Sequence, residues 1–192
     1  MMFVYIVLFL LILMLIYIII VRNKLIIEKN KVKESWAQVD VDLKKRADLI
    51  PNLVDTVKEY TKHEKSTLEE VIEIRNRFNA TKTINEKITA NDEITTALNK
   101  LFALGENYPD LKASDNFLSL QSDLKSIEDD ISLSRKNYND AVLNYNNKVS
   151  FFPSNIVASL LGYNKEDYYE LNNELEREVP KVKFWFFVKN GI

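Results

Sequence analysis

The single histidine of this 192-residue chain, His63, is followed by Glu64, which gives the first half of the H-E-x-x-H pattern of zinc peptidases. Two histidines one helical turn apart hold the zinc ion in that pattern. Thr67 occupies the place of the second histidine, so this chemistry is excluded. One histidine also cannot supply the two E-x-x-H pairs of a ferritin-like di-metal centre. We interpret His63 as a surface residue at a helix junction.

Three successive carboxylates, Glu128, Asp129 and Asp130, are the other pattern that could suggest a cation site. Successive residues of a helix point in different directions, so these carboxylates cannot converge on one ion, and a solvated helix face is the simpler interpretation. The chain has no cysteine and only three glycines, which removes thiolate sites and a glycine-rich phosphate loop. We therefore expect no metal, no cofactor and no catalytic residue, and we predict a protein that is not an enzyme.

Polar residues around Pro51 are the remaining candidates. Arg46 and Asp48 lie near an apolar stripe, and Arg135 and Asn139 lie on a second predicted helix, so these residues could meet across a bundle. We favour the interpretation that they fix helix register and satisfy the carbonyls that Pro51 frees. The alternative is a recognition surface exposed by a kink at Pro51, in which case Arg46→Ala would lose a partner without changing the melting temperature. The candidates for partner binding or bundle register are Arg46, Asp48, Pro51, Asn52, Tyr108, Lys112, Arg135 and Asn139.

The elements that must position these residues begin with an uncharged segment, residues 1–21. As a helix it spans about 31 Å, which matches the hydrocarbon core of a bilayer. A secretory signal peptide would need a basic start, a shorter apolar core and a cleavage site of small residues, and this segment lacks all three. We predict a retained transmembrane anchor that contacts the lipid bilayer through residues 1–21.

The charged residues after this anchor suggest the orientation of the chain in the membrane, and the overall charge argues against a nucleic-acid partner. Residues 22–65 hold eleven basic and eight acidic side chains, so the positive-inside rule places the chain after the anchor in the cytoplasm and the N-terminus outside. A mildly basic segment also suits an anionic lipid surface. The whole chain has a net charge of −2 and no basic stripe, so we expect no nucleic-acid partner.

Apolar residues at steps of three and four predict a long helix after the anchor. The stripe does not change phase at Pro51, so we predict either a kinked continuous helix or a helix that restarts there with Asp48 as its N-cap. The stripe consists of Val32, Trp36, Val39, Leu43, Ala47, Ile50, Val54 and Val57.

Further helices follow from similar patterns. The S-x-x-E pattern that begins at Ser66 predicts a capping box, and the polar residues 79–92 predict a loop or a frayed helix. The run from Ile94 to Leu104 should stop at Gly105. A long helix should begin near Ser114 and end at residues 151–153, before a short helical turn over residues 156–161.

Amphipathic helices of this length must bury their apolar faces on one another. We predict an all-α fold: one N-terminal transmembrane helix continuing into an elongated antiparallel bundle of about four helices, with helices over about 24–62 and 115–150 covered by two shorter ones. A parallel coiled-coil homo-oligomer is the alternative. The predicted domains are the anchor (1–21), the bundle (22–178) and an aromatic extended tail (179–192), which either packs on the bundle or dips into the membrane interface.

Four segments of the chain resemble the LemA family of bacterial membrane-anchored proteins in the same order: SWAQVDVDLKKRADLIPNLVDTVKEY, ENYPDLKASDNF, RKNYNDAVLNYN and FFPSNIVA. The resemblance covers about residues 22–184 and implies an anchored, cytoplasmic, antiparallel helical bundle whose biochemical role is unsettled. Ile74 stands where alanine is usual, and the tail KFWFFVKNGI extends past the usual ending. The matching positions are Trp36, Arg46, Asp48 to Val54, Tyr108, Pro109, Lys112, Arg135, Tyr138, Asn139, Tyr145, Asn146 and Pro153.

Two function classes follow from these patterns. We expect a membrane-tethered, non-enzymatic interaction or scaffold protein of the bacterial cell envelope, with a protein partner that the sequence does not identify. The alternatives are a subunit or regulator of an envelope-maintenance enzyme, or a protein that binds lipid surfaces. A deep pocket with converging titratable groups would favour the enzyme class.

Overall fold

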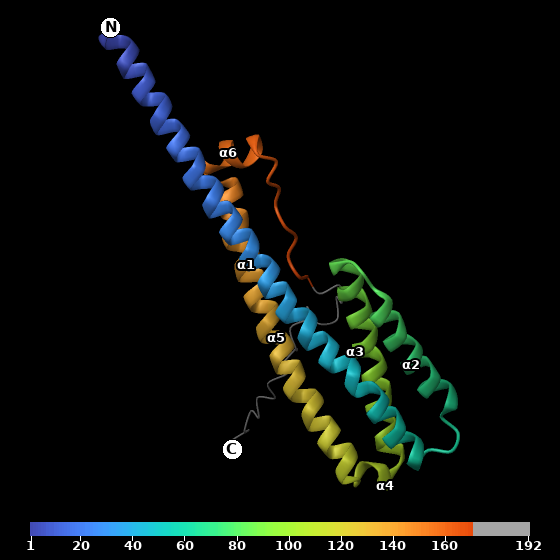
Figure 1. Ribbon diagram of the computed structural model, residues 1–192. Coiled ribbons are helices and arrows are strands. Elements are labelled where there is room, and N and C mark those ends of the chain that lie inside the picture. The colour runs from blue at the N-terminus through green and yellow to red at the C-terminus, as the bar shows by residue number, and fades with distance from the viewer. Residues whose placement is uncertain (171–192) are drawn as a thin grey trace, which may run out of the picture.

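A computed structural model describes residues 1–170 of the chain and confirms the all-α prediction (Figure 1). Two long helices lie side by side in opposite directions, and a pair of shorter helices packs against them at one end. The part of the chain that the structure describes contains no strand. Its helices are α1 (Met2–Tyr60), α2 (Lys65–Ala80), α3 (Ile84–Asn107), α4 (Pro109–Lys112), α5 (Asp115–Ser150) and α6 (Ser154–Leu160).

Helix α1 runs without interruption for 59 residues and contains Pro51 in its interior. The continuity of α1 through Pro51 is confirmed, the kink there stays a prediction, and the restarted helix with Asp48 as N-cap is wrong. Pro51 removes one backbone hydrogen bond, but Ile50 and Leu53 on either side of it are fully buried, so packing holds the helix together there. The predicted stripe is buried along its length apart from the half-buried Trp36.

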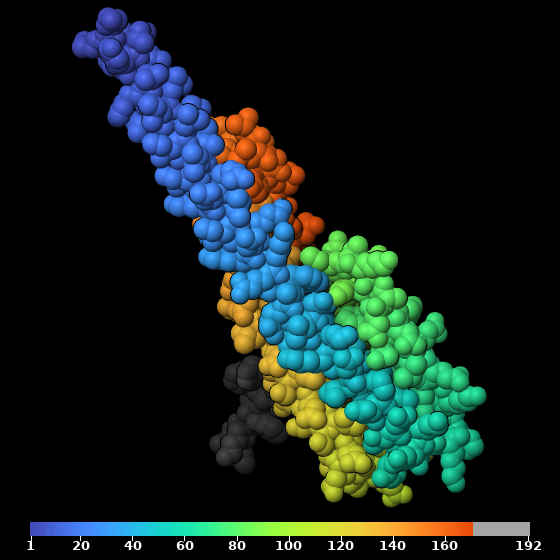
Figure 2. Space-filling model, viewed as in Figure 1, coloured from blue at the N-terminus to red at the C-terminus, as the bar shows by residue number. Residues whose placement is uncertain are grey.

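Residues 1–20 extend beyond the bundle and are exposed, except for the half-buried Ile18 (Figure 2). Burial against the rest of the chain begins at Val21 and Leu25. Of the helices in the described residues, α1 is the one that is long and apolar enough to cross a membrane by length and composition. Its apolar segment and its core-forming segment therefore belong to one rod.

Helix α5 has Ser114 at its N-cap position and Phe151 at its C-cap, as the sequence predicted. It packs along α1 in the antiparallel sense, and fully buried side chains such as Leu43 and Ile131 lie in the core that includes this seam. The apolar stripe of α1 is thus covered by helices of the same chain. This arrangement agrees with the predicted antiparallel bundle and not with the parallel coiled coil.

Helices α2 and α3 form a hairpin whose details differ from the predictions. The capping box lies at the start of α3, where the Thr83 hydroxyl accepts from the Glu86 amide and the Glu86 carboxylate accepts from the Thr83 amide. The Ser66 box is wrong because α2 begins at Lys65, which places Ser66 inside the first turn. Residues 84–92 are helical rather than a loop, since Ile88 and Ala90 are buried in the core.

Helix α3 also continues through Gly105 to Asn107, two residues past the predicted stop. The ring of Phe117 lies against Gly105, where an added Cβ would come within 3.1 Å of two ring carbons. Gly105 therefore leaves room for the Phe117 ring of α5 against the backbone of α3 and does not end the helix. The helix stops at Tyr108, and Pro109 opens the single turn α4.

After α6, Gly162 takes a left-handed φ of +73° and the chain turns back along the bundle. Residues 163–170, which we call the strap, are extended rather than helical and return from α6 toward the start of α3 (Figure 1). The predicted bundle limit at residue 178 and the predicted aromatic tail, residues 179–192, lie outside the described residues.

Candidate functional site

Two asparagines of α5 hold the backbone of the strap in the manner of a neighbouring β-strand. Asn146 donates from Nδ2 to the Glu166 carbonyl at 2.9 Å and accepts from the Glu166 amide at 2.9 Å. Asn139 makes the same pair with Tyr169, at 3.1 Å to the carbonyl and 2.8 Å from the amide. Each carboxamide thereby satisfies both backbone groups of one strap residue, which an extended segment outside a sheet would otherwise leave without protein partners.

The spacing of these two asparagines matches the geometry of an extended chain. Asn139 and Asn146 are seven positions apart, a rise of about 10.5 Å along a helix. The residues they hold, Glu166 and Tyr169, are three positions apart, which spans about 10 Å in an extended chain. Two helical turns of α5 therefore coincide with three residues of the strap, and the strap runs antiparallel to α5.

A tyrosine precedes each asparagine and follows the same spacing. The Tyr145 hydroxyl donates to the Asn164 carbonyl at 2.9 Å, and the Tyr138 hydroxyl donates to the Asp167 carbonyl at 3.0 Å. The repeat Y-N-x5-Y-N is thus a ladder of side chains that binds a polypeptide backbone. We refer to Tyr138, Asn139, Tyr145 and Asn146 as the Tyr-Asn ladder.

Aromatic contacts close the strap over the α1–α5 seam. Trp36 of α1 lies edge-on to Tyr138, with ring centroids 5.4 Å apart, and its ring centroid is 6.4 Å from that of Tyr169. The guanidinium carbon of Arg135 lies 4.5 Å from the centre of the Tyr169 ring. Burial, together with the nearby carboxylates Glu166 and Asp167, raises the pKa of Tyr138 to about 12, so this hydroxyl stays a hydrogen-bond donor at neutral pH.

Arg46 is a buried cation at the junction of α1, α3 and α5, with a relative exposure of 6%. Its Nη1 donates to Asn91 Oδ1 at 3.2 Å and to Thr95 Oγ1 at 3.1 Å, and its Nη2 forms an ion pair with Glu128 at 3.0 Å. Burial lowers the pKa of Arg46 although Glu128 opposes the change, and the positive charge of Arg135 lowers it further. Arg46 therefore connects three helices through its side chain.

This placement corrects the expected meeting of Arg46 and Asp48 with Arg135 and Asn139. Arg46 bonds to α3 and to Glu128, while Asn139 is occupied by the strap. Asp48 is exposed and pairs with Arg75 of α2 at 3.6 Å. The apolar stripe predicted the buried face of each helix, but it could not show that Arg46 bonds to residues of α3 or that Asn139 bonds to the strap.

The other candidates lie elsewhere. Pro51 is half-buried and Asn52 is exposed on α1. At the far end of the bundle the Tyr108 hydroxyl donates to Glu64 at 3.2 Å, which ties α4 to the turn between α1 and α2. Lys112 forms an exposed ion pair with Glu106 at 2.6 Å. The eight candidates thus do not form one site, and whether any of them binds a partner stays a prediction.

Several buried polar residues were absent from the candidates. Asp42 accepts from Lys45 and Gln38, and although burial raises its pKa, these hydrogen bonds outweigh burial and lower it. Glu28, also buried, accepts from Lys148 at 2.7 Å, which lowers the pKa of Glu28. The Tyr145-Asn146 repeat of Tyr138-Asn139 was the sequence signal that could have identified the ladder in full.

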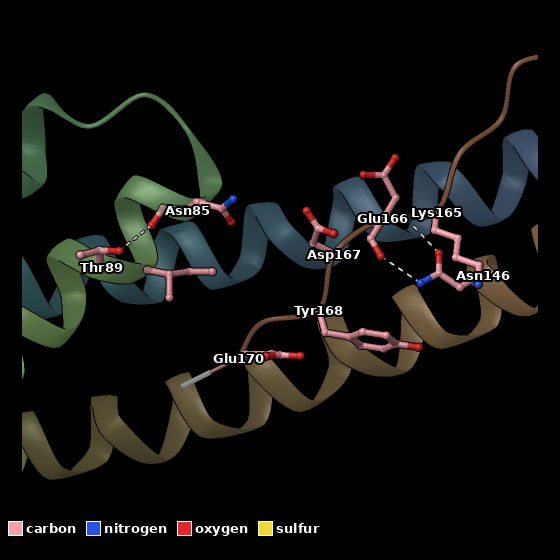
Figure 3. A pocket seen from close by; sticks show the side chains of 9 residues that line it. Asn85, Thr89, Asn146, Lys165, Glu166, Asp167, Tyr168 and Glu170 are labelled. Carbon is pink, nitrogen blue, oxygen red and sulfur yellow. Dashed lines mark hydrogen bonds between the residues drawn. The ribbon is translucent and has the colours of Figure 1, made fainter. Parts of the chain in front are cut away.

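A cleft of about 640 Å³ lies between the strap and the first turns of α3 (Figure 3). Asn85 and Thr89 line it from α3, and charged side chains of the strap line the other side. Figure 3 shows these side chains spread along the strap rather than gathered at one point. One of them, Glu166, forms an ion pair with Lys29 of α1 at 2.9 Å. Residues 1–170 contain no group of three or more acidic or histidine side chains that could hold a metal ion.

The described residues form an elongated, all-helical rod, which places the protein in the class of helical bundles. The family model described as LemA family matches residues 35–184, and the chain therefore belongs to the LemA family. The match ends within the aromatic tail, where the sequence departs from the family pattern.

Individual relatives are similar to this chain over shorter lengths. Protein LemA of Metamycoplasma hominis is 28% identical over 144 residues, which cover 73% of this chain and 64% of that relative. Magnetosome protein MamQ 2 of Paramagnetospirillum magneticum is 31% identical over 74 residues, 38% of this chain and 27% of that protein. Magnetosome protein MamQ of Magnetospirillum gryphiswaldense is 27% identical over 73 residues. This chain thus spans less than two thirds of the length of these relatives.

Proposed function

We propose that this LemA-family chain is a membrane-tethered, non-enzymatic interaction protein that holds a helical bundle in a fixed relation to the membrane. The observation that carries this proposal is the continuity of α1. The same 59-residue helix supplies the exposed apolar segment and one of the two long helices of the bundle core. A helix without a joint transmits orientation, so a partner bound to the bundle would be held at a fixed height and rotation.

The uses of the motif side chains support an interaction role over catalysis. The Tyr-Asn ladder binds the chain's own backbone, and Arg46 bonds to residues of α3 and α5. These groups stabilise one arrangement of the bundle. An active site would require charged side chains that converge on one point. The charged residues of the cleft in Figure 3 do not converge.

We further propose a single-pass anchor at residues 1–21, with the N-terminus outside and the bundle in the cytoplasm of a bacterial cell. The exposed cations Arg22, Lys24 and Lys31 follow the apolar segment, which the positive-inside rule associates with the cytoplasmic side. The chain has no cysteine, so single-cysteine variants can test this orientation. Asn144→Cys should be protected from a membrane-impermeant maleimide in intact cells and labelled after lysis; labelling in intact cells would reverse the proposed orientation.

A crosslinking experiment in intact membranes tests the interaction role. Photo-crosslinking residues at the exposed positions Asp48 and Asn52 should capture a defined protein. A Gly-Gly-Ser insertion after Asn23 should abolish that capture while the chain stays in the membrane, because the insertion breaks the continuity of α1. Capture that is unaffected by the insertion would refute the rigid-rod proposal. Arg46 is unsuitable as a probe since its burial couples it to folding.

A further inference from the structure

The turn between α5 and α6 carries a cluster of exposed apolar side chains next to the anchor segment of α1. Residues 149–163 contain no Asp, Glu, Lys or Arg, in a chain in which 28% of residues are charged. Five large apolar side chains within eleven residues are between 41% and 80% exposed. We call them the α6 patch: Phe151, Phe152, Ile156, Leu160 and Leu161.

Helix α6 is amphipathic in relation to the bundle. Val157 and Ala158 are buried, whereas Ile156 and Leu160 face outward. Other exposed large apolar residues of the bundle, such as Leu133 on α5, are more scattered along the chain and are ordinary for a protein surface. A contiguous apolar cluster of this kind marks an interaction site.

The position of the patch identifies what covers it. A hollow of about 240 Å³ is lined by Tyr17, Val21 and Leu25 of α1 on one side and by Pro153 and Ser154 on the other. The turn before α6 thus lies level with the inner end of the 21-residue apolar segment, and Figure 2 shows α6 beside the point where that segment emerges from the bundle. The ion pair of Glu28 with Lys148 lies about 10 Å further along α1 from Val21, at 1.5 Å per residue.

We infer that the α6 patch inserts into the same bilayer face as the proposed anchor and forms a second membrane contact. This inference rests on the anchor in the proposed function. The hollow between Tyr17 and Pro153 places the turn that carries the patch beside the exposed apolar segment of α1. Aromatic and aliphatic side chains without charges suit the membrane interface. Because the patch lies on one side of α1, its insertion fixes the rotation of the bundle about the anchor axis.

Depth-dependent fluorescence quenching tests the inference on the full chain. The absence of cysteine allows Phe152→Cys and Leu160→Cys to be labelled separately with an environment-sensitive fluorophore and reconstituted into phosphatidylcholine vesicles that contain brominated acyl chains. Phe9→Cys in the anchor and Leu133→Cys on α5 are matched exposed controls, with relative exposures of 60% and 59% at these residues. Circular dichroism verifies that each labelled variant remains helical.

We expect labels at residues 152 and 160 to be quenched several-fold more than the label at residue 133 and to approach the quenching at residue 9. Quenching at residue 9 without quenching at residues 152 and 160 would overturn the second contact and leave the anchor intact. Absence of quenching at residue 9 would overturn the anchor and this inference together. A blue-shifted but unquenched label at residues 152 and 160 would indicate a protein surface as the cover and would also overturn the inference.

Discussion

Helices α1 and α5 bury five polar or charged side chains between them, whereas α2 and α3 bury one, Asn91. That one is the acceptor for Arg46 of α1. The α2–α3 hairpin is otherwise packed through apolar side chains and stabilised at its turn by the Thr83 capping box. The five on the long helices are Glu28, Asp42, Arg46, Ser134 and Asn146.

This difference bears on the single positions through which the chain resembles the LemA family. The matching positions named in the sequence analysis lie on α1, α4 and α5 and in the turns before α4 and α6, although the family model also covers α2 and α3. Apolar packing tolerates many sequences of suitable volume, but a buried hydrogen bond requires a particular side chain at a particular position. The α1–α5 pair is therefore the specified part of the bundle, and the α2–α3 hairpin is its more generic cover.

The comparison between the two helix pairs predicts that a substitution of Arg46 lowers the free energy of unfolding most. Arg46→Ala should lower the free energy of unfolding by about 2–4 kcal/mol, because it removes a buried side chain and leaves the buried Asn91 without its donor. Arg77→Ala on α2 removes an exposed ion pair with Glu93 and should cost at most about 1 kcal/mol. Urea unfolding in detergent, followed by circular dichroism, measures both. Equal costs for the two arginines would remove the distinction between the two regions.

A substitution in the Tyr-Asn ladder should cause the next largest loss of stability. Asn146→Ala removes two hydrogen bonds to the strap and should cost about 1–3 kcal/mol. Hydrogen exchange of the Glu166 amide should accelerate while amides in the centre of α5 keep their protection. Asn144→Ala, an exposed neighbour on α5, is the control and should change stability by less than about 0.5 kcal/mol. Unchanged exchange at Glu166 in Asn146→Ala would contradict the ladder.

Alkaline pH should weaken the same region through Tyr138. Its folded-state pKa is raised from 10.0 to about 12, so its contribution to stability is fully present below pH 10 and is lost as the pH rises from 10 to about 12. The urea midpoint of the unaltered protein should therefore fall more steeply over this range than that of Tyr138→Phe. Tyr60→Phe, at an exposed position, should behave like the unaltered protein. Identical pH profiles for all three proteins would refute the assignment.

The smallest effect concerns the turn of the α2–α3 hairpin. Thr83→Ala removes the hydroxyl that accepts from the Glu86 amide and should cost about 1 kcal/mol. Ser66→Ala should change stability by less than about 0.5 kcal/mol, because Ser66 is exposed and lies inside the first turn of α2. The same urea experiment compares the two. A larger loss in Ser66→Ala would mean that Ser66 is the N-cap and that α2 begins at Thr67, two residues later than described.

The sequence by itself determined the all-α class, the apolar N-terminal segment and the face that each long helix buries. These follow from local properties: an uninterrupted run of apolar residues, an apolar stripe at steps of three and four, and few glycines and prolines. The phase of the stripe through Pro51 left two alternatives, a continuous helix and a helix that restarts there, and the structure shows the continuous one. Helix ends were less certain because packing of Ile88 and Phe117 outweighed the local signals at residues 79–92 and Gly105.

Only the tertiary structure decided the partners of the polar residues. Arg46 could be placed near the seam from the sequence, but Asn91, Thr95 and Glu128 reach it from positions 45 to 82 residues away. The Tyr-Asn repeat was visible, but its ligand is an extended segment that begins about twenty residues later and depends on the turn at Gly162. Periodicity records which face of a helix is buried, and hydrogen-bond partners depend on how separate elements are arranged in space.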